Sequence, residues 1–230
     1  VGTLHIRPVL NMKSDEDIKN MKSISEEAFQ MVKGYKGSHS GEHGDGIVRS
    51  EFHEMMFGKK IVSAFEEIKD TFDYKNLLNP GKIVRPHKSN DRSLMRYKTG
   101  YKANNISTHY DWSNWGQFSD AVEMCNNNGA CRKLDSGVMC PSYRVTKEEK
   151  DLVRGRANTL RLALSNQLPE GSFASKDMYE TMELCVSCKA CQRECPMSVD
   201  MAKMKSEFLS HYYKKFRMPI KARVISDMPR

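Results

Sequence analysis

Four cysteines near the C-terminal end constrain this chain more than any other feature. Cys185, Cys188, Cys191 and Cys195, followed by Pro196, read C-x2-C-x2-C-x3-C-P. Bacterial ferredoxins hold iron–sulfur clusters with this spacing, and the fourth cysteine of such a run can bind a different cluster from the first three. A zinc knuckle or a set of buried thiols is the alternative, but zinc sites usually pair two separated C-x2-C knuckles. The spacing therefore predicts a chain that carries electrons.

The three remaining cysteines resemble a degenerate copy of the same run. Cys125 and Cys131 are six residues apart, as are the first and third cysteines of a complete run, and Asn128 occupies the middle position. Cys140 precedes Pro141, as the fourth cysteine of a run does, although the gap before it is longer than usual. Seven cysteines with this spacing also favour a reducing compartment.

Exchange of the fourth cysteines between the two runs predicts two ligand sets. One 4Fe–4S cluster would take a complete set, namely Cys140, Cys185, Cys188 and Cys191. A second cluster would be one ligand short, with Cys125, Cys131 and Cys195. Three thiolates suit a 3Fe–4S cluster, or a 4Fe–4S cluster whose fourth ligand is water or a side-chain oxygen; the alternative is a vestigial run that binds nothing.

Composition excludes some classes of function. The chain of 230 residues has 37 Lys and Arg against 29 Asp and Glu, a formal charge of +8, but the basic residues are scattered, which argues against nucleic-acid binding. These residues include no pattern of a signal peptide and no apolar run long enough to span a bilayer, so neither feature is expected here. The expected location is the cytoplasm, with peripheral attachment to the inner membrane as an alternative. Because the chain starts at Val1 without methionine, we expect a fragment of a longer polypeptide.

Periodicity predicts a strand followed by several helices. Residues 3–9 alternate between apolar and polar side chains, which is typical of a β-strand. Helices are expected over residues 15–34, after an N-cap at Ser14, and near residues 61–72. In the cysteine-containing half, the capping box Thr146-x-x-Glu149 predicts the start of a long helix, and a further helix is expected over residues 199–216.

The loop "GEHGDG", residues 41–46, places a carboxylate beside an imidazole. Glutamate and histidine together can bind a metal or carry acid–base chemistry, although exposed loops often contain both without either role. Glu42 and His43 are therefore candidate functional residues. His39 and His53 are expected to be ordinary polar residues.

Longer segments resemble a known family. "LHIRPVLN", "GSHSGEHGDGIVRSEFHEMMFG" and "LLNPGKIV" resemble the C-terminal part of FAD-linked oxidases of the vanillyl-alcohol-oxidase type, in the branch that acts on D-lactate, glycolate and D-2-hydroxyglutarate. "CNNNGACRK", "MCPSYRVTKEEKDLVRGRANTLR" and "CVSCKACQRECP" resemble the iron–sulfur extension fused to such oxidases in bacteria. Together these segments span nearly the whole chain.

The resemblance implies several site residues. His5 and Glu42 would bind a divalent metal such as zinc, with a further family histidine expected just upstream of Val1. His43 would be the catalytic base. Asn79 and Lys82 lie in the segment that resembles the FAD-facing closing turn, for which a purely structural turn is the alternative.

Arg7 is a further candidate, predicted from geometry more than from a motif. On a strand it would share a face with His5, where it could bind the substrate carboxylate. A surface salt bridge is the alternative for this arginine.

The expected fold class is α+β. A partial α/β substrate (cap) domain of an FAD-linked oxidase would span residues 1–87, a linker residues 88–118, and a truncated α-helical ferredoxin domain residues 119–230. FAD would be bound mainly by an upstream domain of the same polypeptide. The resemblance implies a small 2-hydroxy acid as substrate and a further electron acceptor, and this part alone is expected to be inactive.

Two other functions stay open at this point. The chain could be an electron-transfer subunit that docks a separate catalytic flavoprotein, which an upstream FAD domain in the same reading frame would exclude. It could also be a zinc-stabilised interaction module, which would yield a colourless protein that contains zinc.

Overall fold

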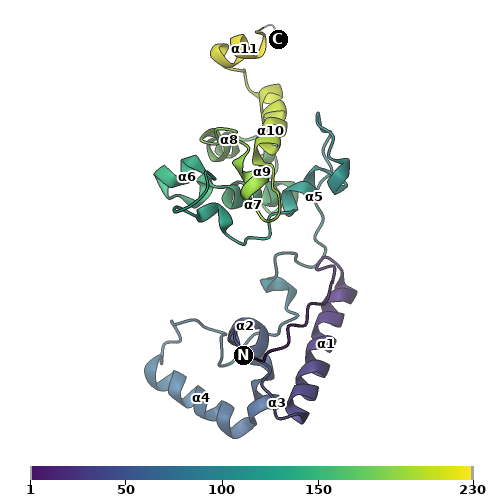
Figure 1. The fold of residues 1–230 in the computed structure, drawn as a ribbon, viewed down its shortest axis with the longest axis vertical. Coiled ribbons are helices and arrows are strands. Elements are labelled where there is room, and N and C mark those ends of the chain that lie inside the picture. Colours follow the sequence, from purple (N-terminus) through teal and green to yellow (C-terminus); the bar gives the residue numbers. More distant parts are fainter. Residues whose placement is uncertain (1, 229–230) are drawn as a thin grey trace. The chain divides into compact units, whose positions relative to one another are not determined.

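A computed structural model describes residues 2–228, and the chain divides into two compact units between Tyr101 and Lys102. Each unit is described by itself, with the element labels of Figure 1. Unit 1 contains the loop with Glu42 and His43, and unit 2 contains all seven cysteines.

Unit 1 is built from one long helix, one medium helix and short helical turns. Its α-helices are α1 (Asp15–Gly34), α2 (Gly46–Arg49), α3 (His53–Phe57) and α4 (Lys59–Phe72). The predicted N-cap is confirmed, since the Ser14 hydroxyl accepts the backbone N–H of Asp17 at 3.3 Å. Further along α1, Phe29 packs edge-to-face against Phe52 with ring centroids 4.9 Å apart. This small aromatic core holds α1 against the segment that leads into α3.

The expected strand and the α+β class are wrong for the part of the chain that the structure describes. Residues 2–228 form helices, turns and irregular segments, with no strand or sheet among them. Leu4 and Ile6 are 90% and 67% exposed, so the apolar side of the predicted strand covers no core. A strand exists only where a neighbouring strand accepts and donates its backbone hydrogen bonds, and the alternation in residues 3–9 cannot supply that neighbour.

Unit 2 is helical and has its own core. Its α-helices are α5 (Phe118–Glu123), α6 (Pro141–Thr146), α7 (Val153–Leu164), α8 (Lys176–Glu183), α9 (Ala190–Glu194), α10 (Met201–Lys215) and α11 (Ile220–Ser226). Helix α7 contacts α5, α8 and α10, and it lies in the middle of the unit in Figure 1. The predicted helix over residues 199–216 is confirmed by α10. Fully buried apolar side chains fill the space around α7, among them Phe118, Leu160, Met182 and Phe208.

The long helix expected from the Thr146 capping box begins later than predicted. Thr146 is the last residue of α6, and its hydroxyl accepts the backbone N–H of Glu148 at 3.2 Å. Helix α7 begins at Val153, after a 3-10 turn over Glu149–Asp151. The Thr146 side chain thus stabilises the turn that follows α6 and does not cap the start of α7.

A buried carboxylate joins α10 to the segment before α5. Glu207 accepts the backbone N–H groups of His109 at 2.9 Å and Tyr110 at 3.0 Å, and the indole N–H of Trp112 at 3.0 Å. Burial raises the pKa of Glu207, but these three donors outweigh it and hold the pKa below its usual value. Trp112 belongs to the core of unit 2, so this end of the expected linker is packed. The linker boundaries themselves stay a prediction.

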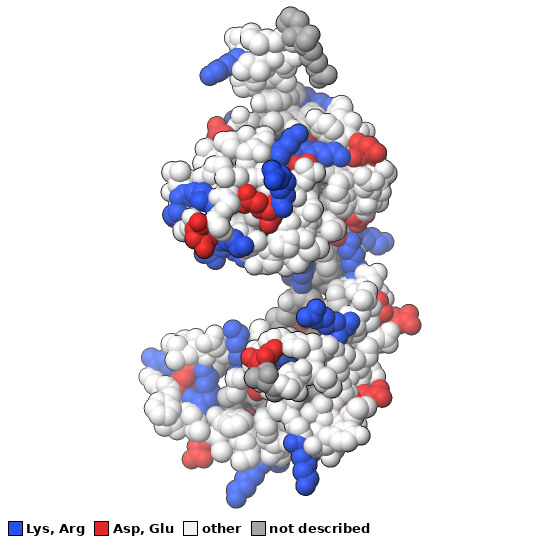
Figure 2. Space-filling view, viewed as in Figure 1, with Lys and Arg blue, Asp and Glu red and all other residues white. Residues whose placement is uncertain are grey.

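Surface charge is mixed. Figure 2 shows Lys and Arg interspersed with Asp and Glu on the face in view of each unit. Within residues 2–228, none of the helices combines the length and the apolar character needed to cross a lipid bilayer.

Gly155 provides a test of how α7 is placed. A Cβ at this position would lie 2.8 Å from the carbonyl carbon of Glu149 and closer still to its oxygen, and a backbone carbonyl cannot rotate away. We expect Gly155→Ala to lower the free energy of unfolding of unit 2 by about 1–3 kcal/mol, the usual cost of overpacking. Urea unfolding measures this loss. Gly34→Ala is the control, because a Cβ at Gly34 meets no atom within 4 Å; equal stability of the two variants would contradict the prediction.

Candidate functional site

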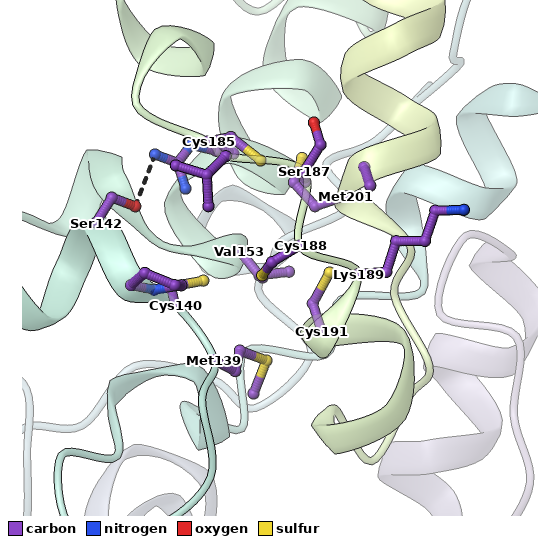
Figure 3. Close-up of a pocket in the computed structure, with 14 residues that line it drawn as sticks. Met139, Cys140, Ser142, Val153, Cys185, Ser187, Cys188, Lys189, Cys191 and Met201 are labelled. Atoms are coloured by element: carbon purple, nitrogen blue, oxygen red, sulfur yellow. Dashed lines mark hydrogen bonds between the residues drawn. The ribbon is translucent and has the colours of Figure 1, made fainter.

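Four of the seven cysteines line one pocket in unit 2. They are the predicted complete set, Cys140, Cys185, Cys188 and Cys191. Figure 3 shows them arranged around a common space, with Cys140 just before α6 and Cys191 on α9. The remaining lining is mostly apolar or backbone, with Met139, Val153, Met201 and Ala202 among its members. Cysteines 45 residues or more apart in sequence therefore share one pocket, as the exchange of ligands between two runs requires.

A carboxylate connects the two cysteine runs. Glu194, the last residue of α9, accepts the backbone N–H of Val138 at 2.9 Å and that of Met139 at 3.1 Å. These two hydrogen bonds hold the pKa of Glu194 below its usual value. They bring the segment before Cys140 against the helix that bears Cys191.

The start of α7 faces sulfurs from both predicted ligand sets. The backbone N–H of Val153 is directed at the Cys140 sulfur, and that of Arg154 at the Cys131 sulfur. The first N–H groups of a helix have no partner within the helix and favour negative charge. In iron–sulfur proteins, hydrogen bonds to the cysteine sulfurs stabilise the thiolates and influence the reduction potential. One helix end can therefore stabilise thiolates in both sets.

The start of α10 acts in the same way on a third thiol. Backbone N–H groups of Met201 and Ala202 face the sulfur of Cys191 and favour its thiolate. Burial nevertheless dominates: it raises the pKa of Cys140 to about 12 and also raises the pKa values of Cys131 and Cys191. Without a metal these thiols stay protonated at neutral pH, and metal binding must displace the protons.

Arg156 is a site residue that the sequence analysis missed. Its side chain is buried, lines the pocket, and donates to the backbone carbonyls of Asp151 at 2.7 Å and Thr181 at 2.9 Å. Its positive charge favours the thiolate of Cys140. An arginine within an otherwise apolar helical stripe was the available signal, but its position beside a sulfur depends on how α7 packs.

The ligand-short set lies in the same core. Cys125 and Cys131 are buried, and Cys195 is half-buried against the core cluster. Asn128 is exposed, and its side-chain oxygen accepts the backbone N–H of Ala130 at 2.8 Å, so this amide stabilises the loop. Whether these three cysteines hold a cluster stays a prediction.

In unit 1, the predicted metal ligands lie together. Nε2 of His5 is 2.9 Å from Oε1 of Glu42, and Nε2 of His43 is 3.6 Å from the same oxygen. One ligand atom from each residue falls within 4.8 Å of the others, and all three side chains are exposed. A Cβ at Gly41 would lie 2.5 Å from Thr3, so only glycine lets the loop approach the N-terminal segment this closely. A divalent metal could bind here, with one or two sites open to a substrate or water.

A second group of possible metal ligands in unit 1 includes the two histidines that were expected to be ordinary polar residues. His39 and His53 are both buried, and Asp45 lies between them, with its Oδ2 2.9 Å from Nε2 of His53. Burial lowers the pKa of His39, so its ring is neutral near pH 7. Burial raises the pKa of Asp45, but the contacts of its carboxylate with His53 and Ser40 outweigh it and hold the pKa below its usual value. The sequence analysis did not predict that both are buried, because their burial follows from the aromatic packing of α1, α3 and α4.

The other predicted site residues are Arg7, Asn79 and Lys82, and none of them belongs to the two histidine-containing groups. Arg7 is exposed, and because no strand forms, the shared face with His5 is absent. Lys82 donates to the side-chain oxygen of Asn79 at 3.3 Å, and both residues line an open pocket against Phe65 and Phe72 of α4. Their roles stay predictions.

Comparison with known families agrees with this division of the chain. Residues 1–83 match the family described as FAD linked oxidases, C-terminal domain, and residues 121–199 match the 4Fe-4S dicluster domain. No solved structure shows a significant match to the chain.

Two of the relatives match both units of the chain. A D-2-hydroxyglutarate dehydrogenase of Pseudomonas putida is 30% identical over 99% of this chain, and one of Escherichia coli is 29% identical over 99%. The chain spans about a quarter of the length of these relatives, since 25% of each is matched. The glycolate oxidase subunit GlcD of Bacillus subtilis is 29% identical over 36% of this chain.

Cysteine variants test the two ligand sets. We expect Cys188→Ser to lose one cluster, about four irons per chain, and Cys131→Ser to lose only the iron of the other set. Iron and acid-labile sulfide, measured on protein prepared without oxygen, give the result, and electron paramagnetic resonance identifies the surviving cluster. Ser187→Ala, which changes a neighbouring pocket residue that is not a thiol, is the control. Unchanged iron in Cys188→Ser would contradict the assignment of the complete set.

The raised pKa of Cys140 predicts a pH dependence of the cluster-free protein. The unfolded chain releases this proton near pH 9, whereas the folded protein keeps it until about pH 12, so the folded state binds more protons across this window. The stability contribution is therefore complete below pH 9 and is lost as the pH rises towards 12. Urea unfolding of the wild type and of Cys140→Ala at several alkaline pH values measures it: the gap between the two proteins should change with pH, and a constant gap would refute the prediction.

Proposed function

We propose that this chain is part of a dehydrogenase that oxidises a D-2-hydroxy acid and passes the electrons to a further acceptor. The proposal starts from the matches of the chain to the C-terminal domain of FAD linked oxidases and to a 4Fe-4S dicluster domain. The observation that carries this proposal is the presence of both sites on one chain: a His–Glu–His cluster in unit 1 and a four-cysteine pocket in unit 2. The activity belongs to the complete polypeptide, since this chain spans about a quarter of the length of these relatives.

The substrate class rests on which relatives match both units. The relatives that match 99% of the chain are named D-2-hydroxyglutarate dehydrogenases, whereas the glycolate and D-lactate enzymes match only 36–39% of it. We therefore favour 2-hydroxyglutarate over glycolate and lactate as the substrate.

The residues of unit 1 supply the acid–base chemistry. His5 and Glu42 would hold a divalent metal, which polarises the hydroxyl and carboxylate oxygens of a 2-hydroxy acid. Nε2 of His43 lies 3.6 Å from the same Glu42 oxygen, so its imidazole can take the hydroxyl proton of a substrate held there. Arg7, whose side chain is exposed on the same N-terminal segment as His5, would bind the substrate carboxylate.

The pocket beside α4 fits one face of a larger cofactor site. Asn79 and Lys82 supply polar groups at its edge, and Phe65, Phe72 and Leu78 supply its apolar wall. It is open, so it cannot enclose a flavin alone. Bound FAD would take two electrons from the substrate and release them singly to iron–sulfur clusters, which is the reason to join the two units.

Exposed apolar side chains on unit 1 support contact with an FAD-binding domain. Phe72 is 83% exposed and Leu77 73% exposed, and both lie at the end of α4 or just after it, beside the pocket of Asn79 and Lys82. Apolar patches of this kind mark interaction surfaces. We assign this surface to the FAD-binding domain of the same polypeptide.

The arrangement of unit 2 fits a relay of two clusters. Because the start of α7 faces Cys140 of the complete set and Cys131 of the other, the two sets adjoin the same helix end. Electrons could then pass between two closely spaced clusters before they leave for the acceptor.

Replacement of His43 tests the proposal. In the complete polypeptide, we expect His43→Ala to lower kcat for D-2-hydroxyglutarate by about 100- to 10,000-fold, the usual contribution of a general base. Iron, sulfide and flavin content should stay as in the wild type. His109→Ala, an exposed histidine in unit 2, is the control. Wild-type turnover in His43→Ala would instead favour an electron-transfer subunit that docks a separate flavoprotein.

A further inference from the structure

His39, Asp45 and His53 form a buried group that the proposed reaction does not use. His39 and Asp45 lie on the loop of residues 37–46, and His53 is the first residue of α3. One ligand atom from each lies within 4.8 Å of the others. They differ from His5, Glu42 and His43 in their burial: the side chain of His39 is 0% exposed and that of His53 only 3% exposed.

The ring of His39 is enclosed without adequate hydrogen bonds. It contacts Phe29 with ring centroids 5.2 Å apart and Phe57 at 5.7 Å. Neither of its nitrogens makes a well-formed hydrogen bond to a described residue, although the Arg49 backbone lies close enough to favour the protonated ring. A buried polar atom without a partner costs free energy, so such a residue in an aromatic core requires an explanation.

The ring of His53 is already oriented as a metal ligand would be. Its Nδ1 lies 3.2 Å from the backbone carbonyl of Ile83, and because a carbonyl only accepts, a hydrogen bond between them places a proton on Nδ1. Metal-binding histidines commonly donate their other ring N–H to a backbone carbonyl in this way. In the neutral tautomer with this bond, the lone pair of Nε2 faces Oδ2 of Asp45, which is 2.9 Å away and also carries lone pairs.

A doubly protonated His53 would explain only part of this arrangement. It would satisfy Oδ2 of Asp45, but it would leave Oδ1 of Asp45 and both nitrogens of His39 without partners. A cation among the three residues would give a partner to the carboxylate and to one nitrogen of each ring, and the other nitrogen of His39 would face the Arg49 backbone. Nε2 of His39 lies 3.7 Å from Oδ1 of Asp45, and ligand atoms of a tetrahedral zinc site with bonds of about 2.1 Å lie about 3.4 Å apart.

We propose that His39, Asp45 and His53 bind a structural divalent metal ion of the zinc type, separate from the exposed site of His5, Glu42 and His43. Two imidazoles and one carboxylate are a donor set that suits zinc. The fourth position belongs to water or to the hydroxyl of Ser40, which neighbours Asp45. The ion joins the loop of residues 37–46 to α3, and, if the proposed function holds, it thereby keeps Glu42 and His43 in position.

Zinc content tests the proposal with the iron–sulfur clusters in place. The complete chain is prepared without oxygen with its clusters assembled, so that the cysteines are occupied, and carries His5→Ala with His43→Ala to remove the exposed site. After zinc loading and desalting, we expect about one zinc per chain. Adding Asp45→Asn should weaken zinc binding by more than about 100-fold, since loss of an outer partner alone costs about 10- to 100-fold.

X-ray absorption at the zinc edge identifies the ligands. Nitrogen and oxygen neighbours at about 2.0–2.1 Å support the proposal, whereas sulfur near 2.3 Å would place the zinc on cysteines and overturn it. This result does not depend on whether the site of His5, Glu42 and His43 binds a metal or on whether the proposed reaction occurs, because the protein measured lacks His5 and His43. A folded protein that retains no zinc overturns the proposal.

His39→Phe keeps the test valid if Asp45→Asn fails to fold. Phenylalanine fits the aromatic surroundings of His39 but has no nitrogen to bind a metal. Zinc should raise the thermal midpoint of the His5→Ala, His43→Ala protein and leave that of the same protein with His39→Phe unchanged. Equal zinc stabilisation of both proteins, or stabilisation of neither, overturns the assignment.

Discussion

The buried start of α7 is the constraint on which unit 2 depends. Its free N–H groups face Cys140 and Cys131, and Arg156, one turn further on, adds a positive charge beside the pocket. The same burial raises the pKa values of these thiols, so the protein core is arranged for thiolates that form only when iron replaces the protons. Gly155 permits this arrangement because the backbone of Glu149 lies against it. The start of α7 thus combines close packing at Gly155, N–H groups that favour thiolates, and sulfurs from both predicted cluster sites.

Unit 1 has a different physical character. Its core is a small group of aromatic rings around His39 and His53, and much of its remaining apolar surface is exposed, as at Phe72 and Leu77. A unit of this kind gains stability from a partner that covers the exposed face, and the proposed FAD-binding domain would do so. The glycine-rich loop lies over the aromatic core, with its buried side chains directed inward and Glu42 and His43 directed outward.

Much of the helical structure and the cysteine site could be predicted from local pattern. The Ser14 cap, the helix over residues 15–34 and the helix over residues 199–216 follow from spacing within a few turns. The grouping of Cys140 with Cys185, Cys188 and Cys191 followed from a spacing rule, and all four line one pocket; that they bind one cluster stays a prediction. The strand over residues 3–9 was wrong because alternation indicates a possible strand, whereas pairing requires a second segment that no local pattern specifies.

The sequence by itself determined the chemistry available to this protein: seven cysteines in two related runs and an E-H-G loop, because metal and acid–base chemistry depend on residue types at short spacings. Only the tertiary structure decided which of these groups are buried and which face each other. His39 and His53 are apart in sequence and unremarkable in composition, yet aromatic packing encloses both around Asp45. Arg156 likewise reaches the cluster pocket because α7 is buried along its length. Burial sets the local dielectric and removes water as a partner, so the behaviour of these groups depends on packing between distant segments.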